Sequence, residues 1–153
     1  MKDFCLWVLK AAVIIAAVLA IPIVRTYSQS GSPGVAGVSL EMSPQSVSAV
    51  LGAPEVEEAS LGMRFWEYRT RGITVIWRDD APGVRAIVLS KRTAGDIRGV
   101  RVGDTKSAIS TNWGLPVRVR GAGRFLDFAG RQWTLSAEIA KGKAVEITLL
   151  AAR

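Results

Sequence analysis

Apolar and polar residues alternate along three short stretches of the chain, at residues 63–69, 73–77 and 84–89. Each stretch is bounded by glycine, aspartate or proline. An alternation with period two predicts antiparallel strands that each bury one face. The same pattern returns near the C-terminus, so we predict two groups of three strands. Their apolar faces are predicted to carry Trp66, Tyr68, Ile73, Val75, Trp77, Val84, Ala86 and Val88 in the first group, and Leu126, Phe128, Trp133, Leu135, Ala137, Val145, Ile147 and Leu149 in the second.

A short helix is predicted before each group of strands. Ser43 is a suitable N-cap, and Pro44 fits the first helical position, where its missing N–H costs nothing. Gly52 supplies a C-terminal stop. Thr105 and Gly114 take the same two roles in the second helix. Each helix has apolar residues on one face, so it needs a sheet to lie on.

The order of these elements repeats along the chain. Gly52 and Pro54 return 62 residues later as Gly114 and Pro116. A nearly constant spacing between matching glycine and proline residues is typical of a duplicated unit. We therefore expect an α+β protein with two tandem repeats, residues 37–92 and 93–153, each built from one or more short helices and a three-stranded antiparallel sheet. One N-terminal hydrophobic helix is expected to precede them.

The N-terminal segment, residues 1–27, has the pattern of a membrane anchor or a secretory signal peptide. An uncharged apolar run at 11–24 follows Lys2 and Lys10, and residues 4–24 are long enough to enter a membrane. Small residues at 18–20 leave cleavage open, but the apolar run continues past them, so we favour an uncleaved signal anchor. Residues 28–36 then read as a flexible linker. This predicts a single-pass inner-membrane protein with its repeats in the periplasm or outside the cell.

The residue inventory argues against an enzyme and against a metal site. There is no histidine, and the single cysteine, Cys5, precedes the repeats. Zinc sites and Cys- or His-based catalysis in the repeats are therefore excluded. Asp79 and Asp80 adjoin Pro82 and Gly83, which is a turn composition. We expect no catalytic residues, no metal and no cofactor.

Positive charge is concentrated in the second repeat. The chain has a formal charge of +7, and residues 93–153 hold ten basic residues against five acidic ones. Such an array suits phosphate or carboxylate recognition, so we predict an anion-binding site for lipid headgroups, while nucleic acid is not expected. A solvated edge strand that is protected from aggregation by its charges explains the same residues, and we favour this interpretation. The candidate residues are Arg118, Arg120, Arg124 and Arg131.

Several apolar residues fall on the predicted open face of the sheet. Apolar side chains on such a face can mark a partner site. They can equally be covered by the other repeat or by a loop. The candidates for protein binding are Phe65, Ile76, Ile87, Leu89, Phe125 and Leu150.

The order of Gly37-Val38-Ser39, a helix, Gly52-x-Pro54 and Trp66-x-Tyr68 resembles the module of the BamE or SmpA-like outer-membrane assembly lipoproteins. In tandem it is also similar to the architecture of the β-lactamase inhibitor proteins. The chain lacks the lipidated cysteine of the first family and the disulfides of the second. The resemblance implies a membrane-tethered, non-catalytic module of the cell envelope that binds an envelope protein. Alternatives are binding of anionic lipid headgroups or other polyanions, and inhibition of a periplasmic enzyme.

Overall fold

The structure, a computed structural model, describes residues 33–152. The expected signal anchor, residues 1–27, and most of the expected linker lie outside the described residues. None of the helices between residues 33 and 152 is long and apolar enough to cross a membrane. The prediction of a single-pass inner-membrane protein therefore has no support in the structure, and we withdraw it.

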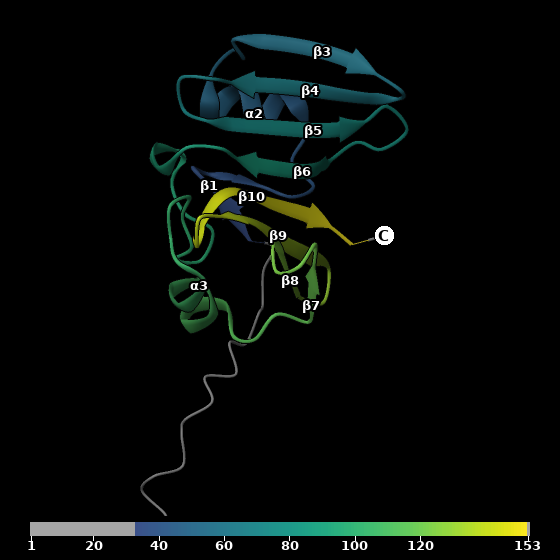
Figure 1. Ribbon diagram of the computed structural model, residues 1–153. Coiled ribbons are helices and arrows are strands. Elements are labelled where there is room, and N and C mark those ends of the chain that lie inside the picture. The colour runs from purple at the N-terminus through teal and green to yellow at the C-terminus, as the bar shows by residue number, and fades with distance from the viewer. Residues whose placement is uncertain (1–32, 153) are drawn as a thin grey trace, which may run out of the picture.

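One antiparallel sheet of eight strands forms the body of the protein, in the order β3-β4-β5-β6-β10-β9-β8-β7 (Figure 1). Each half of the sheet consists of four strands that are consecutive in sequence, and the two halves meet where β6 pairs with β10. The strands are β3 (Val56–Ser60), β4 (Met63–Tyr68), β5 (Ile73–Arg78), β6 (Val84–Leu89), β7 (Arg118–Arg120), β8 (Phe125–Ala129), β9 (Trp133–Ala140) and β10 (Lys143–Ala151).

The predicted fold class is wrong. In place of an α+β protein with two three-stranded sheets, residues 33–152 form a mostly β structure around one continuous sheet, and each half contributes four strands. The predicted groups of three strands omit the two edge strands, β3 and β7, although a charged edge strand was one interpretation of the arginines in β7. Both are exposed along nearly their whole length, so neither needs the alternation that marks a half-buried strand. The expected N-terminal hydrophobic helix lies outside the described residues.

Two eight-residue helices, α2 (Pro44–Leu51) and α3 (Lys106–Trp113), occur where the sequence places them. The Ser43 hydroxyl accepts the N–H of Ser46 at 3.2 Å, and the Thr105 hydroxyl accepts the N–H of Ala108 at 3.2 Å. These bonds satisfy backbone donors that the first turn leaves free. Gly52 and Gly114 end the helices with positive φ angles of 84° and 82°.

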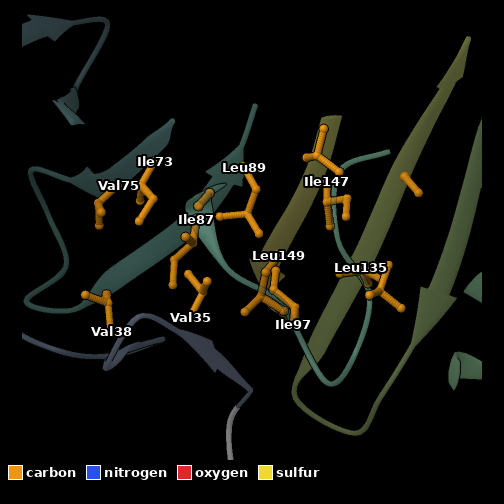
Figure 2. Packing of buried hydrophobic residues seen from close by; sticks show 14 of the residues in the cluster. Val35, Val38, Ile73, Val75, Ile87, Leu89, Ile97, Leu135, Ile147 and Leu149 are labelled. Atoms are coloured by element: carbon orange, nitrogen blue, oxygen red, sulfur yellow. The ribbon is translucent and has the colours of Figure 1, made fainter. Parts of the chain in front are cut away.

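The helices and a small hairpin cover one face of the sheet (Figure 1). The hairpin pairs β1 (Gly34–Val35) with β2 (Val38–Ser39), and a short 3-10 helix, Arg92–Ala94, lies in the connection between the halves. The core is one cluster that runs beneath both halves. Figure 2 shows part of it, with Val35 and Val38 of the hairpin and Ile97 of the connection among residues from β5, β6, β9 and β10.

Aromatic side chains join the covering layer to the sheet. The Tyr68 hydroxyl donates to the carbonyl of Gly52 at 3.1 Å, which fixes the end of α2 against β4. The Trp113 indole N–H donates to the carbonyl of Ile97 at 3.0 Å, and its ring meets Trp133 edge to face at 5.1 Å. In the first half a hydrogen bond of Tyr68 ties the helix to the sheet, and in the second half the ring of Trp113 packs on Trp133 of the sheet while its N–H is bonded to the connection.

Two bulges change which residues face the core. In β6 the register passes from Ile76 opposite Ala86 to Trp77 opposite Val84, so Arg85 is an extra residue. In β10 a second shift makes Val145 the extra residue, and it is exposed although the alternation predicts it as core. Because one extra residue turns the following side chains to the other face, the predicted faces of β6 are reversed beyond Arg85.

Candidate functional site

The face of the sheet opposite the helices is not covered by any described element (Figure 1). The strand register aligns its side chains in rows that cross the strands. Phe65 lies opposite Ile76, Ile76 opposite Ala86, and Ala86 opposite Leu150. These four residues, which we call the apolar row, belong to four adjacent strands, β4, β5, β6 and β10.

The four residues of the apolar row differ in their exposure. Phe65 and Ile76 are half-buried by their neighbours, and Ala86 is buried. Leu150, on the central strand β10, is 39% exposed. Such side chains on an open sheet face can be desolvated further by a partner surface.

An open groove of about 860 Å³ lies at the end of the apolar row that Leu150 occupies. It extends from the turn after β3 to the C-terminal end of β10. Apolar and charged groups both line it. Its walls include Leu61, Met63, Arg78, Arg85, Thr134 and Leu150.

Four of the six residues predicted to bind a protein partner lie on this open face, and two do not. Phe65, Ile76 and Leu150 are in the apolar row, and Phe125 lies on β8 in the second half. The prediction for Ile87 and Leu89 is wrong, because both are 0% exposed and belong to the core. The bulge at Arg85 explains the error, since it places Ala86 and Val88 on the open face instead.

The second half of the open face carries an ionic network. The Arg120 Nε donates to Asp127 Oδ2 at 2.7 Å, and its Nη2 donates to Oδ1 at 3.0 Å. The Ser136 hydroxyl donates to the same Oδ1 at 2.8 Å. Asp127 is only 8% exposed, and a carboxylate at such a position is stable when its oxygens are this fully bonded.

These contacts set the protonation of the pair. The hydrogen bond from Arg120 holds the pKa of the Asp127 carboxyl below its usual range, and Ser136 acts in the same direction while burial opposes both. The same bond raises the pKa of the Arg120 guanidinium. The pair is therefore charged throughout the physiological pH range.

A second ion pair lies beside the first. The Arg124 Nη2 is 2.6 Å from Glu138 Oε1, and its Nε donates to the same oxygen at 2.9 Å. The guanidinium groups of Arg120 and Arg124 lie over the Phe125 ring, at 5.0 and 5.4 Å from its centre. Such cation–π contacts fix the ring between the two arginines.

The four arginines predicted to bind an anion are not brought together as one site. Arg120 and Arg124 are held by carboxylates, and Arg118 is exposed on the edge strand β7. Arg131 is in the turn after β8, whereas Phe125 is at the other end of that strand. Arg131 lines a separate groove of about 520 Å³ with Glu41 and Gln132. The sequence shows the positive charges, but only the strand register shows that Asp127 and Glu138 are their partners.

No group of three or more metal-ligating side chains occurs between residues 33 and 152. On the open face, the carboxylates of Asp127 and Glu138 are bonded to arginines. The described surface thus has an apolar row, a groove with charged walls and a neutralised ionic network.

Comparison with known proteins does not assign the chain to a family. No family model and no curated protein matches the chain. Among solved structures, an extracellular protein containing a SCP domain from Bacillus anthracis str. Ames is similar at 9% sequence identity with a TM-score of 0.47. The alignment covers 73% of this chain and 44% of that one, so the chain spans less than half the length of this neighbour. The resemblance to BamE or SmpA-like modules gains no support, and the fold class that it implied is corrected above.

Proposed function

We propose that the protein is a non-catalytic interaction module that binds another protein on the open face of its sheet. The observation that carries this proposal is the apolar row, Phe65, Ile76, Ala86 and Leu150, which the register places across four adjacent strands. A contact centred on apolar side chains with a polar rim is typical of protein interfaces. The groove beside Leu150 gives this contact a concave end that can receive a protruding side chain.

The chemistry of the row specifies the partner surface. Neighbours of the row along the strands are uncharged or paired, such as Thr74 and Thr148. Binding therefore depends on apolar contact in the centre and on polar groups such as Arg78 and Arg85 at the rim. The expected partner is a folded protein with protruding apolar side chains.

Polyanion binding is the second candidate and is less well supported. A phosphate group would have to compete with Asp127 for Arg120 and with Glu138 for Arg124. Both carboxylates are already at hydrogen-bonding distance. Inhibition of an enzyme remains a special case of the first proposal, in which the bound protein is the enzyme.

The test uses a photoreactive residue at Ile76 in the full chain to capture and identify a binding protein, which is then purified for affinity measurements. Leu150→Glu should weaken binding strongly because it places a charge in the apolar row. Val50→Glu is the matched control, since Val50 is 44% exposed on α2, away from the open face.

The salt dependence separates the two candidates. Binding through the apolar row should change little with ionic strength, whereas polyanion binding should weaken steeply. Equal affinities of the Leu150→Glu and Val50→Glu variants would contradict the proposal.

A further inference from the structure

The two edge strands of the sheet, β3 and β7, run in opposite directions. Every pairing in the sheet is antiparallel, and the number of strands is even. A second copy placed beside the first, with its helices on the same side, would therefore bring its β3 against β7 in the antiparallel direction. The junction would have the same ladder geometry as the strands within one copy.

The charges of the two edges are complementary. Glu57 and Glu58 are exposed on β3, whereas Arg118 is exposed on β7 next to Arg120, which is also exposed although its guanidinium is bonded to Asp127. A contact between two β3 strands or between two β7 strands would place like charges opposite each other, which is unfavourable. A contact between β7 of one copy and β3 of the next brings opposite charges together.

The edges also carry exposed apolar side chains. Seven large hydrophobic residues are exposed in residues 33–152, and four of these are at the edges: Leu115, Val117 and Val119 along and before β7, and Leu61, which is 99% exposed, directly after β3. An edge that is only protected from association needs charges but no apolar residues between them. The alternation of Val117, Arg118, Val119 and Arg120 instead offers one apolar and one basic side to an added strand.

We propose that a second copy of this chain binds edge to edge, with β7 of one copy pairing with β3 of the next. The faces match when Arg120 lies opposite Glu58, because both belong to the open face; Val119 then lies opposite Ala59. The contact uses two different surfaces, so each copy keeps one free edge and assembly continues from copy to copy. The open faces with their apolar rows are joined side by side.

Two variants of the full chain test this arrangement. Val119→Lys blocks β7 and Ala59→Lys blocks β3, because a lysine in the middle of an edge strand opposes pairing. Both residues are exposed, so the fold should persist, which circular dichroism checks. Association is measured by sedimentation at low and high salt.

The unmodified chain should form species larger than a monomer at low salt and lose them at high salt. Each variant alone should lose self-association, and the mixture of the two should form a dimer that does not grow, because one β7 and one β3 edge remain intact. An unmodified chain that is monomeric up to its solubility limit would overturn the proposal. So would variants that associate as the unmodified chain does, or a mixture that stays monomeric.

Discussion

Residues 44–89 and 106–151 each run from a short helix to four antiparallel strands, yet their open faces differ in kind. The first half carries Phe65 and Ile76, with no charge between them in the row. The second half carries the bonded set of Arg120, Asp127 and Ser136. Since the backbone arrangement is shared, the difference arises from side chains alone. One scaffold thus supports a surface suited to contact and a surface that is internally neutralised.

The largest effects should come from the shared core, where the two halves are alike. Trp77→Ala in β5, a residue that is 1% exposed, should lower the free energy of unfolding by about 3–5 kcal/mol. Trp133→Ala in β9 should have an effect of similar size. Because one cluster runs beneath both halves, each variant should unfold in a single transition in urea, followed by circular dichroism. Two separate transitions would show that the halves are independent.

Substitutions at equivalent positions of the two halves should change the free energy of unfolding by different, smaller amounts. Asp127 corresponds to Glu67, 60 residues earlier, and Glu67 accepts from the exposed Arg69 at 2.7 Å. Asp127→Asn should lower the free energy of unfolding by about 1–3 kcal/mol, because it removes bonds to a charged partner at a buried position. Glu67→Gln should change it by less than about 0.5 kcal/mol. Equal losses in urea unfolding would contradict this contrast.

The same pair predicts where acid sensitivity lies. The pKa of Asp127 is lowered in the folded state, so its contribution to stability is present above the ordinary aspartate value of about 3.9 and is lost as the pH falls through the folded value. Asp127→Asn should therefore lose less stability than the unmodified protein as the pH falls below about 4. Unfolding curves across this range measure the difference.

The smallest expected effect concerns Tyr68, whose equivalent in the second half is Phe128. Burial raises the pKa of the Tyr68 hydroxyl, so its contribution to stability is present below about pH 10 and is lost as the pH rises through the folded value. Tyr68→Phe should cost about 1 kcal/mol at neutral pH, through the lost bond to Gly52. It should also reduce the loss of stability above about pH 10. An unchanged alkaline transition in thermal unfolding would refute this assignment.

The sequence predicts those parts of the fold in which local chemistry acts alone. The caps at Ser43 and Thr105 and the stops at Gly52 and Gly114 are local, and both helices are found there. Strands with one buried face show alternation, as β5 and β9 do. The edge strand β3 shows no alternation, because both of its faces are largely exposed. Residues 117–120, along and before β7, do alternate valine and arginine, which fits the interpretation of these arginines as a charged edge strand.

The candidate site could be predicted only in part, because it depends on register. Phe65, Ile76 and Leu150 fall on the open face by simple alternation. Ile87 and Leu89 do not, because one extra residue at Arg85 reverses the side that they face. The ion pairs of Arg120 and Arg124 were equally out of reach, since their carboxylates come from other strands.

The place of β10 in the sheet has a consequence for synthesis of the chain. β10 is the last strand in sequence but lies in the middle of the sheet, against β6 on one side and β9 on the other. As the chain leaves the ribosome, about 60 further residues must be synthesised before β6 can pair with β10. Until then, the core that buries Ile87 and Leu89 is incomplete. During this interval the first half exposes an unpaired strand edge with apolar residues, to which a chaperone or a second nascent chain could bind.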